Sequence, residues 1–324
     1  MKKYLIITLL FFSSFNLFSQ DVEFSQYFAN PLYLNPAFAG TASSARVALN
    51  YRTLLPTSFG DYVTYNASYD QYIEKLHGGI GIQLLNDRQG QGAINIYNFN
   101  LIYSYQFNLS HNFSINAGVK AGYSQNTINP SEMQFPDMFD PVNGIVYPTN
   151  ESLNKISSGF FDFSTGVIGW YKKYYVGLTV SHLAQPNEAP GNSISLLYRK
   201  YTVFLGSKIP FYNSIGKNNL TISPNILYQQ QSDFKKLNLG LYLNYNYVTF
   251  GFWIRQDLPV KINAAIFMFG YEDSGYSISY SYDLPVNKMG IKSIIYGAHE
   301  VTFIVKFEYK NERKKHKAIK CPNF

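Results

Sequence analysis

Hydrophobic and polar residues alternate along many segments of the chain with the period of a β-strand. The clearest segment runs from Tyr97 to Leu109 and holds neither glycine nor proline. Its odd-numbered positions are all aromatic or aliphatic, whereas its even-numbered positions carry Asn, Ser, Gln and one Ile. Because successive side chains of a strand point to opposite faces, this segment has one apolar face and one mostly polar face. It also exceeds the roughly 9–11 residues that a tilted strand needs to cross a bilayer.

Similar runs follow one another along most of the chain and predict about fourteen antiparallel strands. An even number of strands is typical of bacterial single-chain outer-membrane barrels. The pattern therefore predicts an all-β protein, a transmembrane outer-membrane β-barrel. The expected strands cover residues 44–53, 60–71, 76–85, 93–109, 112–124, 159–171, 173–183, 198–210, 219–231, 235–245, 247–256, 262–271, 275–283 and 298–309.

The lengths of the connections between these runs agree with a barrel. Outer-membrane barrels have short periplasmic turns and longer external loops. If the first strand runs outward, the three longest connections, near 125–158, 184–197 and 284–297, all fall on the outside. The turns expected on the periplasmic side are mostly very short.

The composition favours a membrane barrel over a soluble β-sandwich. Aromatic residues make up 18% of the chain and charged residues only 15%, whereas soluble domains carry about a quarter charged residues. A sandwich would also have shorter strands. The polar face of the strands consists mostly of Asn, Ser, Gly and Tyr, which favours a partly filled lumen over a wide channel lined by charges.

The two ends of the chain differ from its body. Residues 1–20 have the features of a signal peptide, with Lys2 and Lys3 before a mostly apolar run that is too short for a spanning helix. Of the net charge of +7, residues 1–20 contribute +2 and residues 310–324 contribute +5, so residues 21–309 are neutral. A nucleic-acid-binding fold would need a basic face, and we therefore exclude that class.

Residues 21–43 precede the first expected strand and show no strand period. Asn30-Pro31 and Asn35-Pro36 each have the pattern of a helix N-cap followed by proline. A disordered leader is the alternative, but the five aromatic residues of this segment argue against it. We expect short helical turns in a packed, plug-like segment, followed by the barrel over 44–309 and a basic periplasmic tail over 310–324.

The long connection 125–158 contains four prolines, and loops of this length are usually functional or disordered. We expect it to fold onto the barrel mouth or to contact a partner. Its carboxylates Glu132, Asp137 and Asp140 lack the spacing of a calcium loop and are expected to be solvated. In the tail, Cys321 is the single cysteine, so it can form a disulfide only with another chain.

The sequence does not support an enzyme, a metal site or a cofactor. Ser181 and His182 are adjacent in an expected strand, so their side chains face opposite sides and cannot form a catalytic pair. The histidines and the cysteine do not cluster as metal ligands do. His299 and Glu300 are expected to hold the start of the last strand or to contact a neighbouring protein.

Three short motifs stand out near the two ends of the chain. The first is the opening segment FSQYFANPLYLNPAFAG, from Phe24 to Gly40. The second is GAHE at residues 297–300, which leads into the last expected strand, and the third is CPNF at residues 321–324. These motifs resemble those at the start and the end of the PorP/SprF family of outer-membrane proteins associated with type IX secretion in Bacteroidota.

This resemblance implies a non-enzymatic barrel that acts by protein–protein contacts in type IX secretion or in surface attachment of secreted adhesins, including those used in gliding motility. It implies an outer-membrane location, and the parity of the expected strands places both termini in the periplasm. The implied partners are other type IX components, a periplasmic peptidoglycan-binding protein and adhesin cargo. A passive or hydrophobic-substrate pore is the alternative. The residues expected to contact partners are Phe24, Gln26, Tyr27, Asn30, Pro31, Asn35, Pro36, His299, Glu300, Cys321, Pro322 and Phe324.

Overall fold

The structure is a computed structural model of the chain. It describes residues 21–42, 44–57, 60–110, 112–140, 142–190, 194–212, 218–259, 261–286 and 297–307. The expected signal peptide and the basic tail, with Cys321, Pro322 and Phe324, lie outside these residues.

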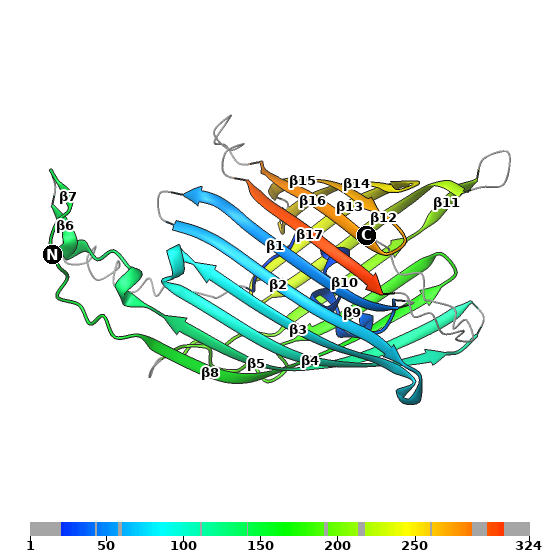
Figure 1. Cartoon of the computed structure of the whole chain (residues 1–324), viewed down its shortest axis with the longest axis horizontal. Coiled ribbons are helices and arrows are strands. Elements are labelled where there is room, and N and C mark those ends of the chain that lie inside the picture. Colours follow the sequence, from blue (N-terminus) through cyan, green and yellow to red (C-terminus); the bar gives the residue numbers. More distant parts are fainter. Residues whose placement is uncertain are drawn as a thin grey trace, which may run out of the picture.

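The described residues form a closed, antiparallel β-barrel of fourteen strands (Figure 1). Each of the fourteen runs expected from the alternating pattern coincides with one strand, so the predicted fold is confirmed. The strands are β1 (Ala45–Thr57), β2 (Gly60–Ile73), β3 (Gly78–Gln89), β4 (Ile94–Asn108), β5 (Phe113–Ile128), β8 (Ile156–Tyr171), β9 (Tyr174–Ser181), β10 (Lys200–Ser207) continued by β11 (Ile209–Tyr212), β12 (Asn218–Gln231), β13 (Phe234–Tyr245), β14 (Val248–Asp257), β15 (Lys261–Glu272), β16 (Tyr276–Pro285) and β17 (Ala298–Phe307).

The barrel closes where the first strand pairs with the last. The register of β1 with β17 runs from Ala45 opposite Phe307 to Leu54 opposite Ala298. Because the sheet closes on itself, neither of these strands is left with an unpaired edge. Among the described helices, each is too short or too polar to span a membrane.

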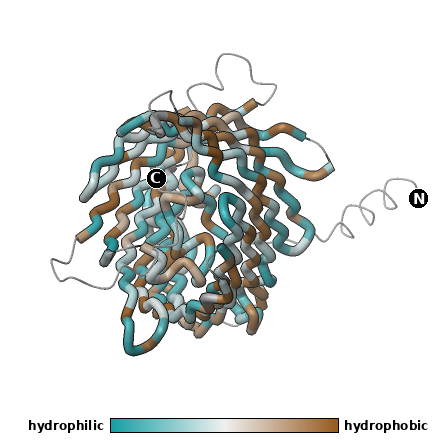
Figure 2. Tube along the Cα trace, turned by 90° about the vertical axis from the view of Figure 1, so that its right-hand side faces the viewer, coloured by the Kyte–Doolittle hydropathy of each residue, from teal (hydrophilic) through white to brown (hydrophobic). Residues whose placement is uncertain are grey.

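The two faces of each strand have the predicted characters, and the alternation is visible along the strands in Figure 2. On β4, Tyr97 and Leu101 are each 52% exposed on the outer face. Ile102 and Ser104, at even-numbered positions of the same strand, point inward and are buried. The apolar face of the segment that begins at Tyr97 is therefore the outer face of the barrel.

The two rims of the barrel differ in the length of their connections. We call the end with the connections 129–155, 182–199 and 286–297 the long-connection rim, and the opposite end the short-turn rim. The connection 129–155 contains η5 (Pro130–Glu132), η6 (Pro136–Met138) and a hairpin of β6 (Phe139–Asp140) and β7 (Gly144–Ile145). It extends beyond the strand ends (Figure 1). It therefore does not fold onto the mouth, which was one of the two expected arrangements.

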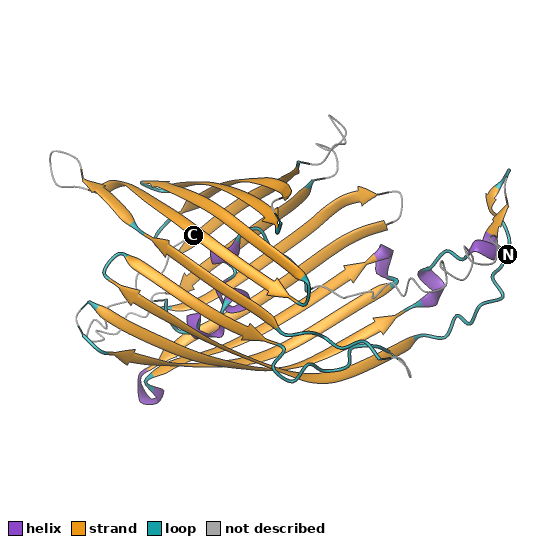
Figure 3. Ribbon diagram, turned by 180° about the vertical axis from the view of Figure 1, so that it is seen from behind, coloured by secondary structure: helices purple, strands orange, loops and turns teal. Residues whose placement is uncertain are grey.

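Residues 21–42 lie inside the barrel, and we call them the lumenal segment. They form η1 (Tyr27–Ala29), α2 (Pro31–Leu34) and η2 (Pro36–Phe38), which Figure 3 shows within the ring of strands. Asn35 acts as the predicted cap, because its side chain accepts a hydrogen bond from the Ala37 N–H at 2.8 Å. Asn30 does not cap its helix, and its Oδ1 instead accepts a hydrogen bond from Asn66 Nδ2 on β2 at 3.1 Å.

Aromatic rings fix the middle of the lumenal segment to the barrel wall. The Phe28 ring contacts Tyr175 and Phe204 edge-on, with centroids 5.8 and 5.7 Å apart. It also lies 6.3 Å from the Trp253 ring, and Phe38 stacks on Phe204 at 5.7 Å. These rings are all buried and fill the lumen at this level, in agreement with the predicted packed N-terminal segment.

Two opposed glycines make room for the segment at η2. Gly118 of β5 pairs directly with Gly166 of β8. A Cβ at residue 118 would lie 2.4 Å from the Ala37 nitrogen, and one at residue 166 would lie 2.2 Å from Asn35 Oδ1. Both distances are too short for real contacts, so the close approach of the segment requires glycine at both positions.

We therefore expect Gly118→Ala to displace η2 and to destabilise the barrel by about 1–3 kcal/mol, the usual cost of overpacking. Hydrogen exchange of residues 35–40 and thermal unfolding in lipid measure the two effects. Gly169→Ala is the matched control, because a Cβ there meets its nearest atom at 3.8 Å. Equal exchange in the two variants would contradict the proposed steric role.

Candidate functional site

A cluster of ionised side chains holds the start of the lumenal segment. We call Arg52, Arg255, Asp283 and Glu300 the anchor cluster, and all four are at least 92% buried. Arg52 contacts Asp283 at 2.9 Å and Glu300 at 3.2 Å, and Arg255 contacts Asp283 at 3.0 Å. Strand register explains this geometry, because Arg52 of β1 lies directly opposite Glu300 of β17.

Ser25 lies at the centre of the anchor cluster. Its hydroxyl accepts hydrogen bonds from Arg52 at 2.6 Å and from Arg255 at 3.0 Å, and donates one to Asp283 at 2.6 Å. Its backbone N–H donates to Glu300 at 2.6 Å. A hydroxyl can donate once and accept twice, so Ser25 uses its full hydrogen-bonding capacity here.

Gln26 binds the same strands through both ends of its carboxamide. Its Nε2 donates to the Glu300 carbonyl oxygen at 2.9 Å, and its Oε1 accepts from the Ser279 hydroxyl at 2.5 Å. The next residue, Tyr27, donates its hydroxyl to Asn238 of β13 at 2.9 Å. The opening motif and the GAHE motif, at opposite ends of the sequence, are thus in direct contact.

Glu300 and His299 point to opposite sides of β17. Glu300 binds the lumenal segment and also Arg52 of β1. The strand-start role and the neighbour contact expected from the sequence stay predictions. His299 faces outward, where its Nδ1 lies 2.6 Å from the Tyr280 hydroxyl. The alternation along β17 was sufficient to place Glu300 in the lumen, where a carboxylate requires a buried cationic partner.

The remaining motif residues also lie in the lumen. Phe24, Asn30, Pro31, Asn35 and Pro36 are buried against the barrel wall or within the segment itself. Their contacts are with this chain, and binding of another protein at any of these residues stays a prediction. Sequence reasoning did not identify Arg52, Arg255 or Asp283, although each is a charged residue on the inward face of a strand.

A second ion pair fixes the other end of the lumenal segment near the short-turn rim. Arg46 of β1 and Asp70 of β2 are both buried and contact each other at 2.8 Å. Asp70 also accepts a hydrogen bond from the Gly40 N–H at 2.8 Å. Gly40 has a φ of +68°, a conformation that favours glycine.

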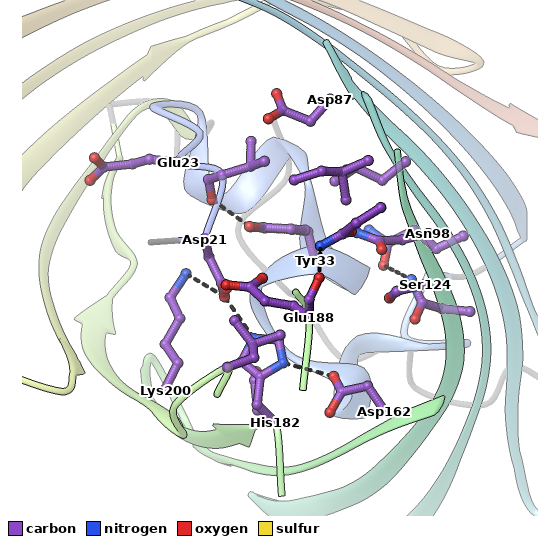
Figure 4. Close-up of a pocket in the computed structure, with 18 of the residues that line it drawn as sticks. Asp21, Glu23, Tyr33, Asp87, Asn98, Ser124, Asp162, His182, Glu188 and Lys200 are labelled. Carbon is purple, nitrogen blue, oxygen red and sulfur yellow. Dashed lines mark hydrogen bonds and ion pairs between the residues drawn. The ribbon is translucent and has the colours of Figure 1, made fainter. Parts of the chain in front are cut away.

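A third cluster holds the first described residue at the long-connection rim (Figure 4). His182, just beyond the end of β9, contacts Asp21 at 2.9 Å and Asp162 at 2.8 Å through its two ring nitrogens. Lys200 contacts Asp21 at 3.4 Å. Burial alone lowers the pKa of His182, but the two carboxylates outweigh it and raise the pKa to about 9.

The first and last described residues, Asp21 and Phe307, lie at opposite rims of the barrel. The ends of the chain lie outside the described residues, so the expected periplasmic location of both termini stays a prediction. Phe307, at the end of β17, pairs with Ala45 at the short-turn rim. Asp21 lies at the opposite rim, so the lumenal segment runs through the barrel before β1 begins.

We expect Glu300→Ala to lower the free energy of unfolding by about 3–5 kcal/mol, because it leaves Arg52 buried without one of its carboxylate partners. Unfolding in lipid, followed by the heat-modified mobility of the barrel on gels, measures this loss. The adjacent outward-facing His299→Ala serves as the control and should cost about 1 kcal/mol or less. Equal losses in both variants would contradict the anchoring role of Glu300.

The tie between His182 and Asp21 should depend on pH. Because the pKa of His182 is raised in the folded protein, its contribution is fully present below about pH 6.5 and is lost as the pH rises through about 9. Protection of the Val22 and Glu23 amides, corrected for intrinsic exchange, should fall roughly tenfold per pH unit in that window. In His182→Gln this pH dependence should be absent, and its persistence would show that another group is responsible.

Comparison with known proteins gives one family and a set of similar folds. The family model described as type IX secretion system membrane protein PorP/SprF matches residues 16–305. The search of curated proteins gives no match. Among solved structures, the Ralstonia pickettii toluene transporter TbuX has a TM-score of 0.52 at 10% identity, over 86% of this chain and 93% of that chain. The P. putida toluene transporter TodX has a TM-score of 0.49 at 11% identity, over 85% and 93%. Likeness at this level of identity shows the fold alone.

Proposed function

Because the chain belongs to the PorP/SprF family of type IX secretion system membrane proteins, we propose that it acts in the outer membrane as a protein-binding barrel. In this role it serves type IX protein secretion or the surface attachment of secreted adhesins. Its contribution is made through contacts with other proteins at its two rims. It does not require passage of a substrate through the lumen.

The observation that carries this proposal is the occupied lumen. The lumenal segment is tied to the wall by the anchor cluster, by the Arg46–Asp70 pair and by the His182 cluster. Between these ties, the Phe28 and Phe38 rings pack against the wall. A conduit would require all of these contacts to break together, whereas a binding platform keeps them.

The proposed orientation places the short-turn rim in the periplasm, as in other outer-membrane barrels. The residues after β17 then lie in the periplasm, where we place the contact with a peptidoglycan-binding protein. The connection 129–155 lies outside the cell and faces adhesin cargo. Its hairpin is held by Asp140, which accepts hydrogen bonds from the Val142 and Asn143 N–H groups at 2.9 and 2.8 Å. Both hydrogen bonds lower the pKa of the Asp140 carboxyl, and the one from the Asn143 N–H has the larger effect.

A passive or hydrophobic-substrate pore is the competing function. The likeness to toluene transporters is a likeness of fold. The lumen of this chain contains buried charged groups such as Arg52 and Glu300 at the level where an apolar solute would have to pass. Because breaking such pairs costs free energy, a pore is less well supported than a protein-binding barrel.

The test compares surface and secreted proteins in cells with and without the gene, complemented by the wild-type chain, Glu300→Ala or His299→Ala. We expect loss of proteins that carry type IX signals on deletion, restoration by the wild type and His299→Ala, and incomplete restoration by Glu300→Ala. Loss of many such proteins marks a general component, and loss of one adhesin marks a dedicated partner. Normal secretion with reduced uptake of a small solute would overturn the proposal in favour of the pore.

A further inference from the structure

The lumen holds a cavity of about 380 Å³ between the lumenal segment and the long-connection rim (Figure 4). Its floor is formed by residues 21–34, and its walls by the inner faces of β3, β4, β5, β8 and β10. Residues 188–190 and 195–197 of the connection between β9 and β10 line its outer side. Its volume lies within the range of small-molecule sites, about 300–1,000 Å³.

Carboxamide side chains form much of the polar part of the cavity wall, beside the ionisable groups. Gln83, Asn98, Asn100, Asn126 and Gln229 all line it. Two of them are oriented by the protein, since Asn126 Nδ2 donates to the Glu188 carbonyl oxygen at 3.1 Å and Gln83 Nε2 donates to Asn66 at 2.9 Å. A carboxamide presents a donor and an acceptor side by side. This pairing matches vicinal hydroxyl groups, each of which can donate and accept.

Several of the charged groups around the cavity are paired with one another, and Asp87 accepts hydrogen bonds from Thr64 and Gln89. His182 lies between Asp21 and Asp162, and Lys200 contacts Asp21. Glu23 is paired with Lys236 at 2.8 Å. A strongly charged ligand would have to compete with these pairs, so the wall favours a ligand that is mainly uncharged.

Lys120 lies near Asp162 and Asp21, which attract it electrostatically, but it does not contact either carboxylate. It points inward from β5, because its neighbour Val119 is 55% exposed on the outer face. Within the described part of the chain, the Lys120 ammonium forms neither a hydrogen bond nor an ion pair, and it lines the cavity. The Lys120 ammonium is therefore available to donate a hydrogen bond to an oxygen of a ligand, whether that oxygen belongs to a ring, a hydroxyl or an acidic group.

Tyr33 supplies a rigid aromatic surface at the floor of the cavity (Figure 4). Its hydroxyl donates to the Val22 carbonyl oxygen, and its ring packs edge-on against Phe24 with centroids 4.9 Å apart. The Lys200 ammonium lies 5.7 Å from the centroid of this ring. With its hydroxyl already engaged, Tyr33 offers a ligand the rest of its ring surface. Aromatic rings pack well against the C–H faces of sugar rings.

From these features we propose that the cavity binds a small carbohydrate of one or two rings, with carboxamides on its hydroxyl groups and Lys120 on one of its oxygens. This site is independent of the role in secretion. Under the orientation proposed above, the sugar reaches it from the outside of the cell. The ring could be free or could end a surface glycan, and the two sources share the same recognition chemistry.

The test uses the full chain in phosphatidylcholine nanodiscs, because alkyl maltoside detergents themselves carry sugars. Glucose, galactose, maltose and cellobiose are titrated and followed by saturation-transfer NMR. We expect at least one sugar to bind saturably. Lys120→Met should weaken that binding by about tenfold or more, the usual effect of losing a hydrogen bond to a charged group. The adjacent outward-facing Val119→Ala is the matched control and should leave the dissociation constant unchanged.

Asn98→Leu, on the neighbouring strand β4, tests the site through a second side chain, and heat-modified gel mobility verifies that each variant is folded. Saturable binding that is unchanged in both Lys120→Met and Asn98→Leu would overturn the proposal, as would the absence of saturable binding for all four sugars.

Toluene, an apolar ring of similar size, tests whether the cavity binds apolar solutes instead of sugars. Toluene binding that strengthens in Lys120→Met would assign the cavity to apolar solutes instead. A polymer-linked maltose that competes with free maltose would show that a glycan end also fits.

Discussion

Ionised side chains buried inside a barrel must be paired within the barrel, and the other features of this lumen follow from that constraint. Arg52, Arg255, Asp283 and Glu300 project inward from four different strands and are all buried. The strands alone bring their charges close together, but they leave hydrogen-bonding capacity unused. Ser25 and Gln26 supply the missing donors and acceptors. The lumenal segment is therefore a structural part of the barrel, and the barrel wall is shaped to receive it, as the small residues Gly118 and Gly166 illustrate.

The strands could be predicted because their signal is local. In a membrane barrel one face of each strand contacts lipid and the other faces the lumen, so apolar and polar residues alternate along each strand. All fourteen expected runs correspond to strands, and the three longest connections share one rim. The composition of the segment before β1 was also sufficient to predict that it is packed, since five aromatic residues in so short a stretch require burial.

The contacts inside the lumen could not be predicted because they join separate elements. Those of Ser25 and Gln26 with Glu300 connect residues more than two hundred positions apart. Glu300 and Gln26 each belong to a recognisable motif, but neither motif specifies the other as its partner. Their pairing depends on which strands flank the seam between β1 and β17 and on how far the lumenal segment reaches. The position of Asp21 could not be predicted for the same reason. A segment placed before the first strand is naturally assigned to the rim where that strand begins, whereas here it starts at the opposite rim and crosses the barrel.

The seam between β1 and β17 links closure of the barrel to retention of the lumenal segment. Arg52 lies opposite Glu300 in the register that closes the barrel, and both contact Ser25. The binding site for Ser25 is therefore complete only when the two strands are paired. Closure of the sheet and binding of the lumenal segment depend on the same residues, so a change that weakens one also weakens the other.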